Sequence, residues 1–539
     1  MVDAVVVGAG PNGLVAANVL ADAGWQVVVL EAQPEPGGAV RSGEVTAPGF
    51  VSDLFSAFYP LGVASPILRA LELEAYGLRW SHAPLVLAHP TPDGRCAVIG
   101  RDVDVTAASL DEYAEGDGDV WQRLVDHYRP IGPHLLDALF TPFPPLRAGA
   151  RLAATLGASG LLRMVRLGVL PVRRLAEEQF AGAGGGLLLA GNALHTDLPP
   201  EAAGSGVYGW LLAMLGQTVG FPVPAGGAGH LTDALVARLA ARGGRLLCDS
   251  EVSGVVVRGG RAVGVRVRGG GEVDAGRAVL ADVSAPALYG RLVGPEHLPA
   301  RMRADLRRFQ WDAATVKVDW ALRSPVPWSS PPARRAGTVH VATGLDELTE
   351  FAAHLATRRI PARPFLLVGQ MTTSDPSRSP AGTESAWGYT HVPQDVRGDA
   401  GGDLTGSWDE RETEAFVTRM EERVEALAPG FRDRILARHV QTPRTLPGVD
   451  HNLHGGAVGG GTSGLHQQVV FRPVPGLGRP ETPVRGLYLA SASAHPGGGV
   501  HGGPGALAAR AALRHAGATG PVADLLVDLA ARRVWGDRR

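Results

Sequence analysis

Apolar positions at the front of the chain predict a strand, a helix and a second strand in quick succession. Residues 3–7 form a short, mostly β-branched run that ends at a glycine, which is typical of a buried strand. A helical segment over residues 14–23 follows, and Gly24 ends it. A second apolar strand over residues 26–30 ends at Glu31. This order predicts a β-α-β unit.

The middle and the end of the chain contain further elements of the same kinds. Residues 231–241 predict a helix with Leu231, Leu235 and Leu239 on one face. Two strands joined by glycine turns follow, over residues 252–258 and 262–268. Near the end, a strand over residues 487–491 leads into a glycine-rich loop, and a helix begins at about Pro504.

The segments between these regions lack this order of strand, glycine turn and helix. In residues 314–322, Val316, Val318 and Trp320 fall on one face of a predicted strand, and Lys317 and Asp319 fall on the other. We expect Lys317 and Asp319 to form a surface pair, and a Lys317 that faces a substrate cavity is the alternative. The sequence from Glu412 to Phe431 is typical of an amphipathic helix. The glycine-rich residues 181–193 follow no strand, so we interpret them as close helix packing.

Residues 151–175 alternate apolar side chains with arginine, which predicts an amphipathic helix. Its arginine face suits an anionic membrane surface, and a solvated face over a protein core is the alternative. No uncharged run reaches the roughly 18 residues of a spanning helix, and no basic leader precedes the first apolar run. We therefore expect a cytoplasmic protein, with peripheral membrane contact as an option.

Length and composition narrow the class of protein. A chain of 539 residues exceeds the roughly 250–300 residues that one hydrophobic core supports, so we expect two domains. The net charge of −2 suggests no nucleic-acid partner. Cys96 and Cys248 are isolated, which excludes a CxxC redox pair and a disulfide framework. No spacing of metal ligands or of a Ser-His-Asp triad emerges, so we expect no metal.

Gly8, Gly10 and Gly13 have the G-x-G-x-x-G spacing between the first strand and the first helix. In a dinucleotide site such glycines allow a tight turn, the approach of the diphosphate to the backbone and close helix–strand packing. The helix N-terminus attracts the phosphates, and Glu31 accepts hydrogen bonds from a ribose. Because an acidic group repels a 2′-phosphate, the pattern favours FAD or NAD over NADP.

The next motif is Gly37-Gly38 followed by Arg41-Ser42. It resembles the glycine doublet of FAD-dependent oxidoreductases in the amine oxidase and phytoene desaturase superfamily. The sequence around Glu251-Val252 and the stretch "AHPGGGVHGGPG" from Ala494 resemble later motifs of phytoene desaturase-like members, especially the branch related to pyridine nucleotide-disulfide oxidoreductase domain-containing protein 2. One departure is Leu465-His466-Gln467, where relatives usually carry an Asp-Gln pair.

The resemblance implies where FAD binds. The doublet, Arg41 and Ser42 would follow its phosphates and ribityl chain, Val252 would contact the adenine end, and side chains at Gly497–Gly499 would occupy the space of the flavin ring. The expected cofactor-binding residues are Gly8, Gly10, Pro11, Asn12, Gly13, Glu31, Ala32, Gly37, Gly38, Arg41, Ser42, Val252, Gly497, Gly498, Gly499, Val500, Gly503 and Pro504.

The resemblance also implies an α/β fold in which a Rossmann-like FAD-binding domain is interleaved with an α+β substrate domain. We expect residues 1–75, 223–300 and 441–539 in the FAD-binding domain. Residues 76–222 and 301–440 would form the substrate domain. The expected activity is hydride removal from an apolar small molecule, with C–C desaturation favoured and oxygen, a quinone or another carrier as the electron acceptor.

Alternatives remain open at this point. They are a flavin-dependent isomerase, an amine or alcohol oxidase on the same fold, a simple NAD dehydrogenase, and a lipid-escort protein without flavin. His454 and His495 are the candidate catalytic residues, since a histidine near the flavin motif could orient substrate or accept a proton. A hydrogen-bonded structural role is the alternative for each of them.

Overall fold

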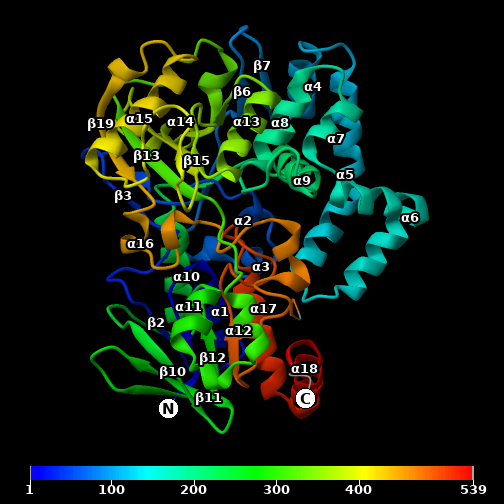
Figure 1. Ribbon diagram of the computed structural model, residues 1–539, viewed down its shortest axis with the longest axis vertical. Helices are drawn as coiled ribbons and strands as arrows, with labels where there is room; N and C mark the ends of the chain where they lie inside the picture. The colour runs from blue at the N-terminus through cyan, green and yellow to red at the C-terminus, as the bar shows by residue number, and fades with distance from the viewer. Residues whose placement is uncertain (1, 477, 537–539) are drawn as a thin grey trace.

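A computed structural model describes residues 2–476 and 478–536 of the chain. Two seven-stranded sheets organise the molecule, one in the lower half of Figure 1 and one in the upper half. Helices cover both sheets. A helical arm, coloured cyan, protrudes from the right-hand side of the view.

The lower sheet has the strand order β10-β11-β12-β1-β2-β9, and β20 pairs with β12. Its parallel part is β20, β12, β1, β2 and β9, and β10 to β12 form an antiparallel meander. The strands are β1 (Val2–Val7), β2 (Val27–Leu30), β9 (Arg245–Leu247), β10 (Val252–Arg258), β11 (Arg261–Val267), β12 (Glu272–Ala281) and β20 (Leu487–Leu489). The short β-branched run at the front of the chain is thus a central parallel strand that is covered on both faces.

Three helices pack on one face of the lower sheet. They are α1 (Pro11–Asp22), α10 (Gly229–Ala241) and α17 (Gly503–Ala516). Helix α1 begins at Pro11, three residues before the predicted start, because proline is well suited to the first turn of a helix. Apolar side chains of η2 (Leu288–Leu292) and of the C-terminal helix α18 (Gly520–Trp535) pack on the other face.

The upper sheet has the order β19-β13-β17-β16-β14-β6-β7 and is mostly antiparallel. Its strands are β6 (Leu85–Pro90), β7 (Cys96–Ile99), β13 (Ala314–Leu322), β14 (Ala336–Val341), β16 (Leu366–Gln370), β17 (Glu384–Val392) and β19 (Ile435–Gln441). The strands of the two sheets alternate along the sequence, so the chain crosses between the halves several times. The domain boundaries at residues 75, 222, 300 and 440 stay predictions.

Apolar clusters cover both faces of the upper sheet. Helix α15 (Glu410–Glu425) covers one face, and a helical group covers the other. That group comprises α4 (Val103–Asp111), α5 (Asp117–Leu139), α6 (Leu146–Val169), α7 (Val172–Gln179), α8 (Ala183–Ala193), α9 (Ser205–Thr218) and α13 (Leu345–Ala356). Residues 181–193 accordingly form a packing helix, as predicted.

Shorter elements complete the described chain. The helices are α2 (Pro60–Ala64), α3 (Pro66–Arg69), α11 (Ala285–Ala287), α12 (Ala300–Leu306), α14 (Met371–Ser374) and α16 (Leu446–Val449). Three two-stranded sheets pair β3 (Ser42–Gly43) with β4 (Ser52–Asp53), β5 (Trp80–Ser81) with β8 (Val223–Pro224), and β15 (Arg359–Ile360) with β18 (Gly398–Asp399).

The pair Lys317 and Asp319 corrects one prediction. The lysine Nζ lies 2.5 Å from a carboxylate oxygen of Asp319, and both side chains are buried. Alternating polarity normally indicates a solvated face, but this strand lies inside a sheet that is covered on both sides. The expected ion pair forms, and the expected surface position is wrong.

A buried arginine joins the two halves of the molecule. Arg378 donates hydrogen bonds to Asp53 and Asp375 at 2.9–3.2 Å and to the carbonyl oxygen of Pro224 at 3.0 Å. Asp53 also accepts a hydrogen bond from Ser42 Oγ at 3.0 Å. Because Ser42 follows the Gly37-Gly38 doublet, this network fixes the doublet against the upper half.

Candidate cofactor-binding site

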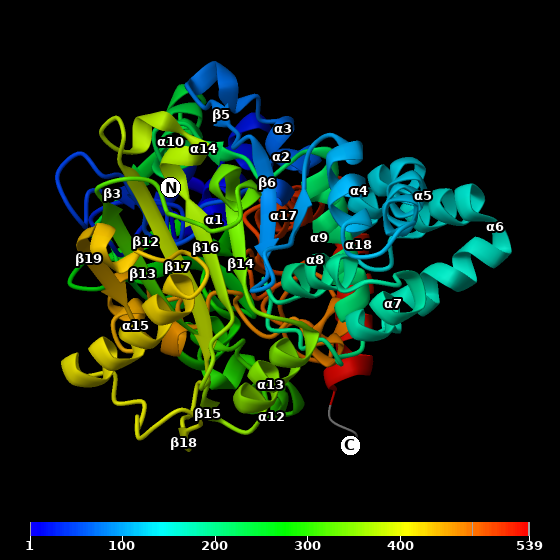
Figure 2. The same cartoon turned by 90° about the horizontal axis from the view of Figure 1, so that it is seen from above.

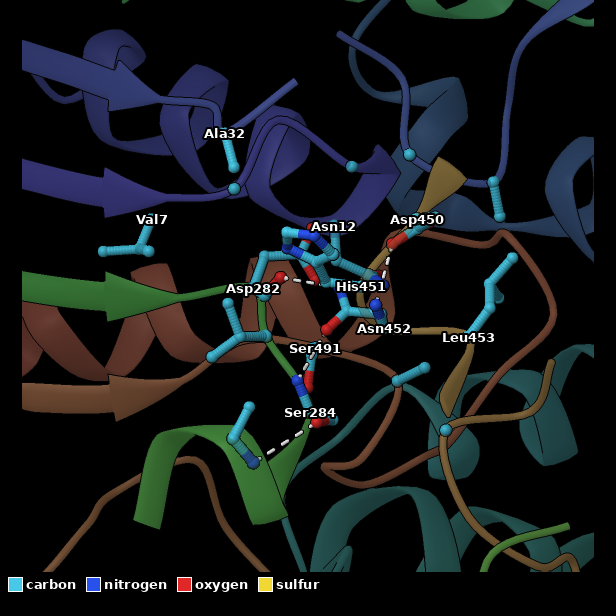
Figure 3. Close-up of a pocket in the computed structure, with 18 of the residues that line it drawn as sticks. Val7, Asn12, Ala32, Asp282, Ser284, Asp450, His451, Asn452, Leu453 and Ser491 are labelled. Carbon is cyan, nitrogen blue, oxygen red and sulfur yellow. Dashed lines mark hydrogen bonds between the residues drawn. The ribbon is translucent and has the colours of Figure 1, made fainter. Parts of the chain in front are cut away.

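A cavity lies at the carboxyl ends of β1, β2, β12 and β20 (Figure 3). Ligands of open α/β sheets bind at this edge. The cavity holds about 1340 Å³ of empty space, with its open mouth included. Its lining comes from three distant parts of the chain, within residues 7–41, 251–292 and 449–500. The glycine-rich segments at the front and at the end of the chain therefore meet around the same cavity.

The N-terminus of α1 forms one wall. Gly10 caps the helix without a side-chain hydrogen bond. In the first turn Pro11 has no N–H group and the N–H of Gly13 donates to Asp282, so Asn12, which lines the cavity, has the backbone N–H group that is left for a ligand. A Cβ atom on Gly10 would lie 2.7 Å from Asp282 Oδ2, and one on Gly13 would lie 2.1 Å from the carbonyl oxygen of Gly8. Only glycine fits either position, and the exposed helix end suits an anionic group.

Glu31 follows β2 and lies beside this helix end. Its Oε2 accepts a hydrogen bond from the backbone N–H of Ala9 at 2.6 Å, and its Oε1 accepts one from Gln33 at 2.9 Å. The side chain is buried, and these two bonds fix the carboxylate at the cavity wall. A fixed carboxylate here favours ribose hydroxyls and disfavours a 2′-phosphate.

Two further carboxyl groups, which no sequence motif marked, lie in the same wall. Asp282 follows β12, and its Oδ2 accepts a hydrogen bond from the backbone N–H of Gly13 at 2.7 Å. Burial raises the pKa of Asp282 to about 8, and the charges of Asp450 and Glu31 add to this effect. Burial also raises the pKa of Asp450. Asp282 therefore favours the neutral acid, which removes negative charge from the wall.

Asn452 organises the loop that carries Asp450. Its backbone N–H donates to Asp450 Oδ1 at 2.9 Å, and its Nδ2 donates to the carbonyl oxygen of Asp282 at 3.2 Å. Its Oδ1 accepts a hydrogen bond from the backbone N–H of Ser284 at 2.8 Å (Figure 3). The asparagine thus joins the two lining segments near residues 282 and 450.

The structure brings most of the predicted cofactor residues to the cavity. Those in the lining are Gly8, Gly10, Pro11, Asn12, Glu31, Ala32, Gly38, Arg41, Val252, Gly498, Gly499 and Val500. Those outside the lining are Gly13, Gly37, Ser42, Gly497, Gly503 and Pro504. Cofactor contact by these residues stays a prediction.

The glycine loop near the end of the chain is also constrained by its own backbone and by its neighbours. Gly497 and Gly499 have φ of 113° and 125°, a region that other residues rarely adopt. A Cβ atom on Gly498 would lie 3.1 Å from the carbonyl oxygen of Gly459. That side chains here would fill the space of a flavin ring stays a prediction.

Arg472 holds these loops together. Its guanidinium group is buried and donates to the carbonyl oxygens of Ala492 at 2.7 Å, Gly459 at 3.0 Å and Thr462 at 3.0 Å. Burial lowers its pKa. Val500, at the end of the glycine loop, has a φ of 49°. A β-branched residue in this left-handed region is strained, and such strain is typical of functional sites.

Neither candidate catalytic histidine lines the cavity. His454 stacks on Trp311, with ring centroids 4.8 Å apart. His495 is half-buried, and burial lowers its pKa. The lining contains His451 instead. Among residues 2–476 and 478–536, no three His, Cys, Asp or Glu side chains are grouped to hold a metal ion. The catalytic roles of His454 and His495 stay predictions.

Comparisons with known proteins agree with this architecture. A family described as an NAD(P)-binding Rossmann-like domain matches residues 6–71. Pyridine nucleotide-disulfide oxidoreductase domain-containing protein 2 of Rattus norvegicus is 29% identical, over 95% of this chain and 93% of that protein. One chain of the limonene dehydrogenase of Castellaniella defragrans is 23% identical, over 96% and 95%.

Two solved structures share the fold at low sequence identity. An oxidoreductase from Methanosarcina mazei matches with a TM-score of 0.62 and 18% identity, over 95% of this chain and 99% of that one. A triple mutant of putrescine oxidase matches with a TM-score of 0.59 and 18% identity, over 95% and 98%. The fold is the two-domain fold of FAD-dependent amine oxidases and related oxidoreductases, which confirms the predicted fold class.

The chain shares its fold with these oxidoreductases. It is similar over nearly its whole length to pyridine nucleotide-disulfide oxidoreductase domain-containing protein 2. The resemblance inferred from the motifs is thereby confirmed. A flavin or another nucleotide is the class of cofactor that these relationships support.

Proposed function

We propose that the protein is an FAD-dependent oxidoreductase that removes a hydride from an apolar small molecule, with C–C desaturation as the favoured reaction. The observation that carries the proposal is the single cavity shared by the front and the end of the chain. Its lining includes Glu251 and Val252, which match the adenine-end motif, as well as Gly499 and Val500 of the glycine loop. A cavity that brings these motifs together suits a dinucleotide that carries a ring system beyond its diphosphate.

The residues present fit the two polar parts of FAD. The N-terminus of α1 offers the positive end of its dipole and the backbone N–H group of Asn12 to a diphosphate. The glycines beside it leave no space for a Cβ atom, so the backbone stays accessible. Glu31 offers a fixed carboxylate to ribose hydroxyls. With the pKa of Asp282 at about 8, this residue keeps its proton at neutral pH and does not repel the phosphates. Bound FAD would supply the hydride acceptor.

Three neighbouring aromatic side chains, Phe58, Trp387 and Tyr389, support an apolar substrate. A Cβ atom on Gly62 would lie 3.1 Å from the carbonyl oxygen of Val500, so this segment lies against the glycine loop. Phe58, four residues earlier, packs on Trp387 with ring centroids 5.9 Å apart, and Tyr389 stacks on Trp387. We propose that these rings form one wall of the substrate site.

The similarity to a chain of limonene dehydrogenase also supports an apolar substrate. The electrons would leave the enzyme through an external acceptor such as oxygen, a quinone or another carrier. We propose a cytoplasmic location, because the two free cysteines form no disulfide.

The test begins with the cofactor. Purified protein is expected to carry FAD, or to take it up in an equimolar amount after addition, with a bound-flavin absorption spectrum. Glu31→Ala is expected to weaken FAD binding at least tenfold, and Glu177→Ala, an exposed glutamate on α7, is the matched control. Anaerobic addition of cyclic and linear unsaturated hydrocarbons, amines and alcohols then asks which class bleaches the flavin. Protein that binds no FAD would overturn the proposal.

A further inference from the structure

The exposed apolar side chains of this protein are concentrated on one side. Among the described residues, sixteen large hydrophobic side chains are exposed, and eleven of them belong to three segments. Those eleven are Leu146, Leu161, Leu162, Val165 and Val169 in α6, Val469 and Phe471 in η9 (Val469–Phe471), and Val522, Leu525, Leu526 and Leu529 in α18. We call these eleven residues the apolar face. Exposed patches of this kind mark interaction sites.

The three segments are joined in the structure. A Cβ atom on Gly478 would lie 3.1 Å from the carbonyl oxygen of Val469 and 3.2 Å from Phe143, so the loop after η9 lies beside the base of α6. Trp535 in α18 donates a hydrogen bond to the carbonyl oxygen of Pro475 in the same loop at 2.8 Å. In Figure 1 the α6 arm protrudes on the right, and α18 lies below it on the same side.

Helices α6 and α18 each expose a stripe of apolar side chains to solvent. The exposed positions 522, 525, 526 and 529 have the i, i+3, i+4, i+7 spacing of one helix face. Val534 and Trp535, in the last turn of α18, pack against the protein instead. In α6 the exposed positions 161, 162, 165 and 169 also share a face, whereas Met164 is buried. The apolar stripes are therefore separate from the faces that stabilise the fold.

Helix α6 is apolar enough to be a candidate membrane span, and little of it is buried. Its geometry argues against spanning, because Gly157 has non-helical φ and ψ of 64° and 178° and divides the helix into two arms. Figure 2 shows the two arms as a projecting bend. Each arm is about 18 Å long, which is shorter than the roughly 30 Å hydrocarbon core of a bilayer.

The charge of α6 indicates the partner. The helix contains Arg147, Arg151, Arg163 and Arg166 and no acidic residue. Arg166 pairs with Glu178, and Arg151 lies 3.5 Å from Asp137 in an exposed pair. A protruding helix with apolar and arginine side chains has the character of an interfacial helix that lies in an anionic membrane surface.

We infer that the apolar face docks this protein on the surface of an anionic lipid bilayer, with the two arms of α6 lying in the headgroup region. The apolar side chains enter the outer part of the acyl region, and the arginines contact lipid phosphates. Each exposed arginine adds about a fivefold gain in affinity at low salt. The inference does not depend on the cofactor or the reaction, because docking is a property of the surface alone.

Flotation of the full-length protein with vesicles tests this. Vesicles of phosphatidylcholine with one quarter phosphatidylglycerol are expected to carry the protein, and pure phosphatidylcholine vesicles to carry much less. Leu162→Glu with Val165→Glu is expected to reduce binding at least tenfold. Arg147→Gln with Arg163→Gln is expected to reduce it about 25-fold at low salt. The matched control is Val105→Glu with Leu436→Glu, at exposed positions outside the apolar face.

Far-UV circular dichroism checks that each variant is folded. Light scattering after size-exclusion chromatography tests the alternative that a second copy of the chain covers the apolar face. The inference is overturned if wild-type protein does not float with anionic vesicles, or if the control variant loses binding equally. It is also overturned if the protein self-associates and Leu162→Glu with Val165→Glu abolishes only that association.

Discussion

Asp282→Asn is the substitution that tests the electrostatics of the cavity most directly. The change keeps the shape of the side chain, and the amide oxygen can still accept the hydrogen bond from Gly13 N–H that the carboxyl group accepts at 2.7 Å. It removes only the ability to ionise. Any difference that depends on pH therefore reports the proton of this one group.

The magnitude follows from the pKa of Asp282, which rises from 3.8 to about 8 on folding. The folded chain keeps a proton that the unfolded chain has lost, so the stability contributed by this group falls as the pH rises between these values. The fall is about 1.4 kcal/mol per pH unit, and it reaches about 4 kcal/mol at pH 7. Asparagine has no such dependence, so the variant is expected to be more stable than the wild type, increasingly so toward pH 8.

Urea unfolding of the cofactor-free protein at pH 5, 6, 7 and 8 measures this difference. The matched control is Asp274→Asn, an exposed aspartate on the same strand β12, whose difference from wild type is expected to be flat with pH. FAD titrations add a second readout. Wild-type affinity is expected to fall above about pH 8, where Asp282 ionises beside the diphosphate, and the variant's affinity is expected to stay constant.

The reasoning is refuted if the stability difference between Asp282→Asn and wild type does not change from pH 5 to pH 8. A variant that is less stable than the wild type at every pH would refute it as well. Removal of the ionisable group would then not raise the free energy of unfolding, as the reasoning requires.

Three more predictions concern other parts of the framework. Gly505→Ala places a Cβ atom 1.9 Å from the carbonyl oxygen of Asn12, so α17 must move away from α1, and the affinity for FAD and the melting temperature should both fall. Gly517→Ala is the control, because its Cβ atom would have no atom nearer than 3.5 Å. Equal effects of the two substitutions would contradict the prediction. Arg378→Met leaves Asp53 buried without its partner and should cost about 3–5 kcal/mol in urea unfolding, whereas a loss below about 1 kcal/mol would mean that water replaces the arginine. The hydrogen bonds of His515 to Glu481 and Asp524 raise its pKa, so its stabilising effect should be complete below about pH 6.5 and disappear as the pH rises through the raised pKa. His515→Gln should therefore lower the melting temperature at pH 6 and lower it much less at pH 9. The reverse order would show that the ion pairs do not form.

The parts of the fold that were predictable have a local physical signature. The run before Gly8, the glycine spacing and the start of α17 each follow from rules that act within about ten residues. Backbone contacts that bring distant segments together leave no such trace. Asp450 and Asn452 lie in irregular chain between short helices, and nothing in their neighbourhood marks them as cavity residues.

Asp282 did carry a usable signal, because it is the first polar residue after an apolar strand. In a parallel sheet that position faces the ligand edge. The pair Lys317 and Asp319 shows the opposite case. A strand with alternating polarity predicts one solvated face, and only the tertiary structure, which covers both faces of the sheet, overrides that local rule. The purpose of Gly505 was equally hidden, since its close neighbour Asn12 is almost 500 residues away in the sequence.

The order in which the lining appears along the chain affects how the protein is made. Strand β12 is paired with β1, and the helix that packs against α1 begins only at Gly503. A ribosome must therefore synthesise about 500 residues of this chain before the opening β-α-β unit has all its neighbours. A stop codon before Gly503 would remove the helix that completes the packing around this unit, so retention of the nucleotide would report synthesis through α17.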